Sequence, residues 1–255
     1  MAPVTTPAVL LRGYDYGDSS RILRFYTRDH GLVSVIAKGV RGRSGKGGTT
    51  LSNFASGDLS AYVRTHRDLH TMKDFQCVKL REGLGRDVLR FAGASAAAEL
   101  VLVHAEAEPQ TGVFRALETT LDALEGAVGD RVPGTVLAGL WSIIESFGFA
   151  PQLDGCVRCH ETLEEKEVGR FDFAAGGLRC AACGHDTAGP RVGPGARSQI
   201  TSLLAGDVPR EFSHAPQHLT LVSDFIVYHV ASRPLKSLTF LGGLMPDGEA
   251  AVSDG

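Results

Sequence analysis

The stretch SRILRFYTRDHGLVSVIAKGV, residues 20–40, decides the fold of the N-terminal part of this chain. Residues 20–27 and 32–40 alternate Val, Ile, Leu and aromatic side chains with other residues, a period typical of β-strands. The tetrapeptide RDHG between them supplies turn-forming residues. The stretch therefore predicts two short strands joined by a turn.

Three more strand-like runs flank this pair, at residues 7–17, 57–65 and 68–80. Turn-forming segments separate the runs, among them GDSS, THRD and the glycine-rich RGRSGKGGTT. Five short strands in this length suit a small closed barrel, which leaves no exposed sheet edge. We therefore expect an OB-fold barrel over residues 1–80.

Beyond Arg81 the apolar residues recur at helical spacing. Five helices are expected, over residues 86–108, 111–128, 133–149, 196–206 and 217–233. The predicted architecture is multidomain α+β: the OB-fold barrel, a helical bundle over residues 81–150 and 191–245, an inserted four-cysteine zinc module over residues 151–190, and a frayed tail over residues 246–255.

The cysteines occur as two C-x-x-C pairs, in CVRCH (residues 156–160) and CAACGH (residues 180–185). The first pair alone is ambiguous, because C-x-x-C-H also attaches c-type haem and C-x-x-C also forms redox dithiols. The complete spacing, C-x2-C-x20-C-x2-C, lets four thiolates close a tetrahedral shell around Zn²⁺. We interpret it as one structural zinc site, with no open coordination position, held by Cys156, Cys159, Cys180 and Cys183.

Two histidines lie next to the cysteine pairs, and other features of the sequence indicate a location in a reducing compartment. His160 and His185 are able to replace one ligand, but we prefer to interpret them as surface or supporting residues. The N-terminus lacks a basic segment followed by an apolar core, and no apolar run reaches eighteen residues. The sequence therefore predicts a cytoplasmic protein without a membrane span, where metal binding is favoured over disulfides.

Charge is distributed unevenly along the chain. The net charge is −3, yet residues 1–80 carry twelve Lys and Arg against six acidic residues, giving +6. The remaining residues carry 14 basic and 23 acidic side chains, giving −9. A basic barrel on an acidic body indicates a polyanionic partner.

The densest basic cluster is KGVRGRSGKGG, residues 38–48. A glycine-rich basic loop is able to follow a phosphate backbone, although a solvated hairpin tip would have the same composition. It is not a Walker A loop, because Val40 and Gly47 occupy the glycine and hydroxyl positions of that motif. The basic residues that we expect to bind DNA are Lys38, Arg41, Arg43 and Lys46.

Strand alternation places aromatic and basic side chains on one face. In residues 20–28, Arg24, Tyr26 and Arg28 share a face, and Tyr62 and Arg64 share a face of the later strand. Rings that stack on bases beside guanidinium groups that meet phosphates are typical of single-strand binding. The alternative is that both tyrosines only cover the barrel rim. We expect all five residues to contact DNA.

The chain resembles the RecO family of bacterial recombination mediators over nearly its whole length. GFAPQLDGCVRCH (residues 148–160), SSRILRFYTRDHGLVSVIAKGVR (residues 19–41) and HVASRPLKSLTFL (residues 229–241) carry the resemblance. It implies an N-terminal OB-fold, a helical domain and a zinc module. It also implies binding of single- and double-stranded DNA and annealing of complementary strands.

The resemblance further implies partners. With RecR, such proteins help to load RecA-type recombinase onto DNA coated with single-stranded DNA-binding protein (SSB), and they recognise the C-terminal tail of SSB. Lys38, Arg41 and Arg43 match the family's basic positions after the third strand. The SSB groove has no motif here, and Arg115 beside Phe114 is the residue that we suggest for it.

Three other classes remain open from the residues themselves. One is an RNA-binding transcription or translation factor with a zinc ribbon, another is an enzyme with redox cysteines, and the third is an adaptor that binds no DNA. No catalytic triad, paired carboxylates or open metal site emerges, so we expect neither catalysis nor a small-molecule substrate. We expect a cytoplasmic, nucleoid-associated DNA repair protein.

Overall fold

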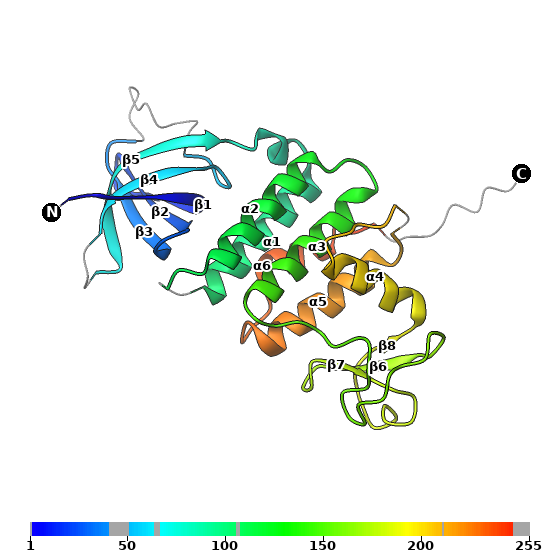
Figure 1. The fold of residues 1–255 in the computed structure, drawn as a ribbon. Coiled ribbons are helices and arrows are strands. Elements are labelled where there is room, and N and C mark those ends of the chain that lie inside the picture. Colours follow the sequence, from blue (N-terminus) through cyan, green and yellow to red (C-terminus); the bar gives the residue numbers. More distant parts are fainter. Residues whose placement is uncertain (1, 41–50, 64–66, 106–107, 211, 247–255) are drawn as a thin grey trace, which may run out of the picture. The chain divides into compact units, whose positions relative to one another are not determined.

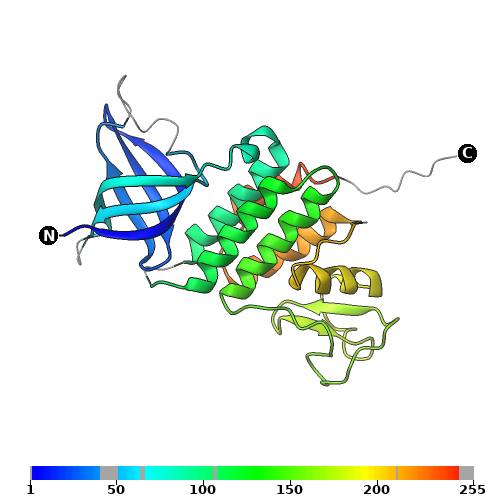
Figure 2. The same cartoon turned by 45° about the horizontal axis from the view of Figure 1, so that its top comes forward.

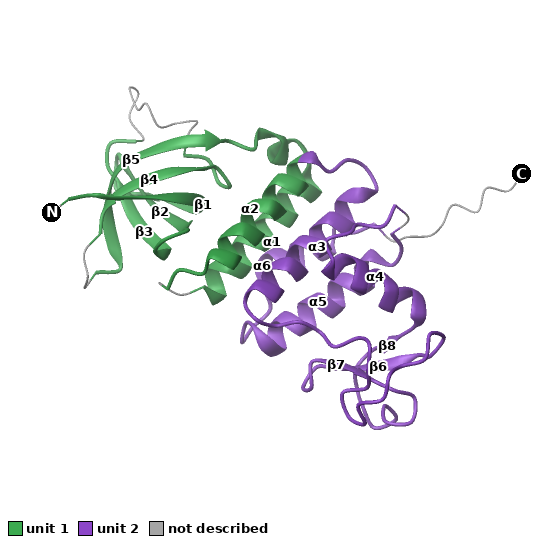
Figure 3. Ribbon diagram, in the orientation of Figure 1, with its two compact units in different colours: residues 1–125 green, residues 126–255 purple. Residues whose placement is uncertain are grey.

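The computed structural model describes residues 2–40, 51–63, 67–105, 108–210 and 212–246 (Figure 1). The chain forms two compact units, residues 1–125 and residues 126–255 (Figure 3). The first unit therefore contains the barrel together with the first two helices. The second contains the four-cysteine segment and the remaining helices.

The first unit contains a closed five-stranded barrel. Its strand order is β1-β2-β3-β5-β4, in which β3 and β5 are parallel and the other pairs are antiparallel. This confirms the predicted barrel. The strands are β1 (Val4–Tyr16), β2 (Ser20–Thr27), β3 (Gly31–Ala37), β4 (Ser56–Tyr62) and β5 (Leu69–Lys79).

Alternation along the strands builds the barrel core. On β2, Leu23 and Phe25 point inward and are fully buried. Val35 of β3 joins them, and the ring of Phe75 on β5 lies 5.1 Å from that of Phe25, centroid to centroid. Because successive side chains point to opposite faces, the residues between them face outward.

A short 3₁₀ helix and two α-helices complete the described part of the first unit. They are η1 (Glu82–Arg86), α1 (Val88–His104) and α2 (Thr111–Gly126) (Figure 2). Asp87 caps α1 by accepting a hydrogen bond from the N–H of Arg90. Arg81, between β5 and η1, has a buried side chain that donates to the carbonyl of Phe54 at 2.7 Å.

The second unit contains four α-helices within its described residues. They are α3 (Arg131–Ser146), α4 (Pro194–Leu204), α5 (Ala215–His229) and α6 (Lys236–Gly242). Trp141 of α3 is buried against Phe225 of α5, with ring centroids 5.2 Å apart. The sequence did not predict α6 as a separate helix, because this helix follows the break at Pro234 and is only seven residues long.

The four-cysteine segment lies between α3 and α4 and forms a small sheet, in the order β7-β6-β8. Its strands are β6 (Gly169–Asp172), β7 (Gly177–Arg179) and β8 (Arg191–Val192). Phe171 of β6 is fully buried, and its ring lies 6.1 Å from that of Phe225 on α5. The sheet therefore packs against the helices of its own unit.

Three boundaries in the structure differ from the expected ones or bear on them. The third strand ends at Ala37, so the KGV that follows it belongs to a turn rather than to the strand. The tail from residue 247 onward lies outside the described residues. The division between units falls after Glu125, inside the segment expected to form the first part of the helical bundle. Among the described residues, every helix is too short or too polar to cross a bilayer.

Candidate functional site

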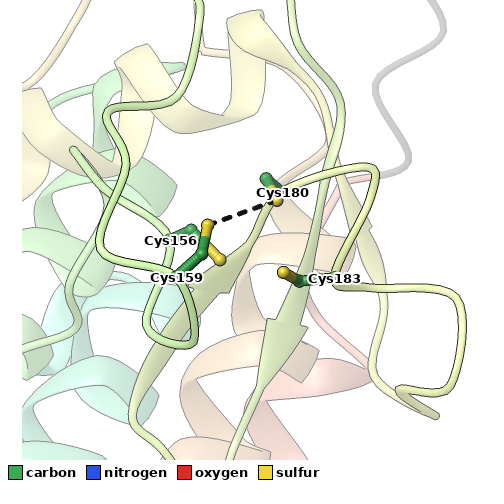
Figure 4. A group of neighbouring side chains, drawn as sticks. All are labelled: Cys156, Cys159, Cys180 and Cys183. Carbon is green, nitrogen blue, oxygen red and sulfur yellow. Dashed lines mark hydrogen bonds between the residues drawn. The ribbon is translucent and has the colours of Figure 1, made fainter.

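Four cysteine side chains from two distant segments meet in one cluster (Figure 4). The sulfur atoms of Cys156, Cys159, Cys180 and Cys183 all lie within 4.8 Å of one another, and those of Cys159 and Cys180 are 3.8 Å apart. A tetrahedral zinc ion with Zn–S bonds of about 2.3 Å separates its sulfurs by about 3.8 Å. The donor set and its spacing therefore fit one metal ion.

Each cysteine pair lies in a tight backbone turn. The N–H of His160 donates to the carbonyl of Cys156 at 2.9 Å, and the N–H of Gly184 donates to that of Cys180 at 2.9 Å. His160 closes the first turn with a left-handed φ of 62°. At Gly184 a Cβ would lie only 3.0 Å from the carbonyl oxygen of Cys180, so glycine fits this close approach. The two turns are local structures that C-x-x-C spacing specifies.

Contacts outside the four cysteines hold the turns in place. The N–H of Val157 donates to the carbonyl of Leu178 on β7 at 2.8 Å, which ties the first turn to the sheet. The carboxylate of Glu167 accepts from the N–H of Ala181 at 2.7 Å, within the second turn. The sequence analysis did not predict this role for Glu167, because its partner Ala181 lies 14 residues later in the chain.

The protonation of the thiols also fits a cation site. Burial raises the pKa of Cys156, but the N–H groups of Cys159, Cys180 and Arg158 outweigh it and lower this pKa to about 6. The hydrogen bond with Cys180, with burial, raises the pKa of Cys183 to about 12. The sulfurs are thus too close to ionise together without a compensating cation, which a divalent metal supplies.

The two neighbouring histidines do not belong to the cluster. Among the described residues, the metal-sized group contains the four cysteines alone. His185 has its Nδ1 3.0 Å from the carbonyl oxygen of Ala182, and His160 is exposed. Both placements agree with the preferred interpretation of these histidines as supporting or surface residues.

The second candidate site is the outer surface of the barrel. Strand register places side chains from all five strands in one outward row: Tyr14, Ile22, Ile36, Thr71 and Tyr62. The rings at its two ends are four strand spacings apart, about 19 Å along the surface. In the next row, Arg12 lies opposite Arg24.

We call Arg12, Tyr14, Tyr16, Arg24 and Tyr62 the aromatic–arginine face. Tyr14 and Tyr16 are 43% and 54% exposed, large fractions for aromatic side chains. The guanidinium of Arg12 lies 5.1 Å from the ring centroid of Tyr14, a cation–π contact. The face thus presents rings and positive charges together.

Sequence reasoning missed three members of this face. Arg12, Tyr14 and Tyr16 alternate in RGYDYG, residues 12–17, and alternation at period two was the signal that could have found them. They were assigned to a strand, but their common outward direction was not considered.

Tyr26 requires a correction. It points outward on β2, as the alternation predicted, but it is fully buried and its hydroxyl donates to the carbonyl of Gln110 at 3.4 Å. The residues just before α2 cover this end of the face. A ring without exposed surface cannot stack on a base, so the structure removes Tyr26 from the candidate residues.

The other predicted DNA-binding residues differ in exposure. Lys38 is exposed directly after β3, whereas Arg24 and Tyr62 are half-buried. Arg28 is exposed, but its Nε lies 2.9 Å from Asp29, which compensates its charge. Four further residues lie outside the described part of the chain: Arg41, Arg43, Lys46 and Arg64.

Arg115, suggested for a groove in the helical domain, does not share a surface with its neighbour. Arg115 is exposed on α2, while Phe114 is buried and lines a cavity of about 180 Å³ with Pro7 and Val78 of the barrel. The side chain of Arg115 therefore faces solvent, whereas that of Phe114 faces the barrel. The pair does not form one side of an apolar groove.

Comparison with known proteins gives matches over both halves of the chain. The family model described as "Recombination protein O N terminal" matches residues 1–81, and "Recombination protein O C terminal" matches residues 85–239. Together they include the barrel, the helices through most of α6 and all four cysteines.

Individual relatives match over most of their length. A "DNA repair protein RecO" of Desulfatibacillum aliphaticivorans is 32% identical over 257 residues, covering 96% of this chain and 98% of the relative. The protein of the same name from Rubrobacter xylanophilus is 34% identical, covering 80% and 82%. That from Geobacter metallireducens is 30% identical, covering 97% and 100%.

Proposed function

Because this chain belongs to the RecO family of DNA repair proteins, we propose that it is a recombination mediator that binds single- and double-stranded DNA and anneals complementary strands. The observation that supports this most directly is the aromatic–arginine face. Stacking on an aromatic ring contributes about 1–3 kcal/mol per base, largely without regard to sequence. A mediator needs such tolerance, because it acts on strands of any sequence.

DNA binding on this surface combines two kinds of contact. Tyr14, Tyr16 and Tyr62 supply rings for bases, and Arg12 and Arg24 supply charges for phosphates. Lys38 extends the basic surface, with Arg28 as a weaker member beside Asp29. From the sequence we also assign DNA contacts to Arg41, Arg43, Lys46 and Arg64.

Annealing requires no covalent chemistry. Two single strands repel each other, and a basic surface lowers that repulsion while their bases pair. Binding releases counterions from the phosphates, so affinity and annealing rate fall as salt rises. Holding both strands on one protein also raises their effective concentration. We therefore propose a binding protein rather than an enzyme.

The four cysteines hold one Zn²⁺ in this proposal. Four thiolates fill a tetrahedral shell, so the ion supplies structural cross-linking and no Lewis-acid site. The hydrogen bond from Val157 to Leu178 holds the first turn against β7. The sheet in turn packs against α5 through the contact of Phe171 with Phe225. The module thus braces the helices of the second unit. The acidic residues 161–167 beside it oppose contact with phosphates.

We further propose RecR and the C-terminal tail of SSB as partners, in a pathway that loads RecA-type recombinase on SSB-coated DNA. Family membership supports this assignment, and it implies a location in the cytoplasm at the nucleoid.

The experiment that tests the function is annealing of two labelled complementary DNA oligonucleotides, with and without SSB, over a salt series. We expect fast annealing that salt suppresses, and we expect a triple variant (R41E, R43E, K46E) to suppress it as well. Preference for an RNA competitor would instead favour an RNA-binding factor. A folded, metal-loaded protein with no annealing and no salt-sensitive binding would contradict the proposal.

A further inference from the structure

A cavity of about 510 Å³ opens beside the barrel within the first unit, where β5 leads into η1. Its lining comes from the start of β2, from residues 51–54 before β4, and from a third segment between Leu80 and Phe91. Its volume lies in the usual range for small-ligand sites, about 300–1,000 Å³. The cysteine cluster and the aromatic–arginine face contribute no residue to it.

Two aromatic rings form part of the cavity wall. Phe54 and Phe91 both line it, and their ring centroids are 5.5 Å apart in an edge-to-face arrangement. Phe54 is almost fully buried, but Phe91 is 44% exposed at the start of α1. An exposed phenylalanine ring supported by a buried one offers a flat surface on which a planar ligand can stack.

The polar part of the lining suits a planar heterocycle. Arg21 donates from Nη1 to the carbonyl of Leu51 at 3.0 Å, which holds its guanidinium at the cavity. Asn53 lines the cavity and is exposed, so its side-chain amide offers both a donor and an acceptor. Rings, a guanidinium and an amide are the groups that bind unstacked bases in single strands.

The cavity wall is held rigidly in an unusual backbone conformation. Phe54 and Arg81, which both line it, have positive φ values of 71° and 53°. Phe54 is fixed on both sides: its N–H donates to the carbonyl of Leu10 at 2.7 Å, and its own carbonyl accepts from Arg81 at 2.7 Å. Such conformations in bulky residues persist where the surroundings impose them, and they concentrate at functional sites.

Described residues on both sides of the basic segment lie at or next to this cavity. Arg21 is the register partner of Ala37, and Lys38 follows directly. The segment that contains Arg41, Arg43 and Lys46 then rejoins the described chain at Leu51, a lining residue. Groups expected to contact phosphates are therefore connected at both ends to a cavity with base-binding chemistry.

We propose that this cavity receives one unstacked base of a DNA single strand, stacked on Phe91 with its polar edge towards Asn53 and Arg21. The inference rests on the proposed function, because the base belongs to the strand that the barrel binds. It adds an enclosed contact to one base, beside a surface whose rings stack on bases and whose charges contact phosphates along the strand.

The test is equilibrium binding of the full-length protein to a labelled oligo-dT strand and to an abasic strand of equal length. Phe91→Ala is expected to weaken oligo-dT binding about tenfold, the loss of one stacked base. Binding to the abasic strand and the slope of affinity against salt should not change, because the phosphate contacts remain. Asn53→Ala should weaken oligo-dT binding to a smaller extent.

Two variants serve as controls. Val88→Ala truncates a side chain that is 59% exposed on the same helix but does not line the cavity, and it should bind as the wild type does. Phe91→Trp keeps a stacking ring and should retain affinity even if the alanine variant is less stable.

The outcomes separate the two proposals. A wild type without salt-sensitive DNA binding contradicts the proposed function and this inference with it. If the wild type binds and Phe91→Ala binds equally well, the cavity takes another ligand and the inference alone is wrong. Equal losses on oligo-dT and on the abasic strand would also overturn it, because a base contact must disappear with the base.

Discussion

Arg81 Nη2 lies 2.8 Å from Glu118 Oε1, although the arginine side chain is fully buried. The same guanidinium donates to Asp122 at 2.8 Å and to the carbonyl of Phe54 at 2.7 Å. One side chain after β5 thus joins the barrel to two acidic residues of α2. Burial of a charge is tolerated only with this degree of pairing.

We expect Arg81→Ala to lower the free energy of unfolding by about 3 kcal/mol or more, because it removes the cation that pairs with Glu118 and Asp122 and the donor to the Phe54 carbonyl. Chemical denaturation followed by fluorescence or circular dichroism measures this change. Lys79→Ala is the matched control, since its exposed ion pair with Asp122 should contribute less than about 1 kcal/mol. Equal effects of both variants would contradict the assigned role of Arg81.

Tyr14→Ala should weaken single-stranded DNA binding by about 1–3 kcal/mol, because its exposed ring stacks on a base in the proposed function. Tyr26→Phe should leave DNA affinity unchanged, because that ring is buried and only its hydrogen bond to Gln110 is lost. Fluorescence anisotropy with a labelled strand measures both. The reverse order of effects would mean that the residues before α2 move away from Tyr26 in solution.

Elemental analysis of the purified protein should find about one zinc per chain, and less than half an equivalent would undermine the metal assignment. Cys156→Ser should lower stability by several kcal/mol, because structural zinc binding supplies folding free energy. DNA affinity of the variant that still folds should change less. Cys77→Ser, outside the cluster, is the control for substituting a cysteine.

The pH dependence of stability should contain a contribution from His218. Burial, with a smaller effect of His214, lowers its pKa from 6.5 to about 4. The unfolded state therefore binds the proton more tightly, so this contribution is present above about pH 6.5 and is lost as pH falls towards 4. Its full size is about 3 kcal/mol.

Urea unfolding at about pH 7.5 and about pH 5 measures this contribution, expected to be roughly 2 kcal/mol over that interval. His218→Gln keeps a polar partner for Gln199, whose Oε1 lies 2.9 Å from Nε2 of the histidine, but has no titrating ring. Metal loss at low pH affects both proteins, so the difference between them isolates His218. Parallel pH profiles would show that its ring is hydrated in solution.

The sequence predicted those features that depend on local pattern. Alternation in residues 20–40 identified two barrel strands, and the spacing of the cysteine pairs predicted that the four cysteines form one cluster, since each C-x-x-C closes its own turn. The helix after Pro234 was missed, because seven residues carry too little periodicity to distinguish a short helix from a tail.

Features that depend on distant partners could not be predicted. Alternation gave the outward direction of Tyr26, but its burial depends on Gln110, 84 residues later in the chain. From the sequence, Arg81 would be expected to be an ordinary exposed residue at a strand end. Its burial depends on Glu118, which lies 37 residues later in the chain. Tyr14 is different, because the alternation in residues 12–17 was a local signal for its outward direction. Its exposed position on the aromatic–arginine face was therefore predictable from the sequence.

The strand order has a consequence for synthesis of the protein. A nascent chain from which only β1, β2 and β3 have emerged can form at most a three-stranded meander with β1 and β3 as open edges, because their other neighbours, β4 and β5, come later. At about 5–20 residues per second, the ribosome adds the residues from Ala37 to Lys79 in roughly 2–8 seconds. During that interval both edges are templates for pairing with another nascent chain. Strand pairing between nascent chains on neighbouring ribosomes of one messenger RNA is thus a route to misassembly of this barrel.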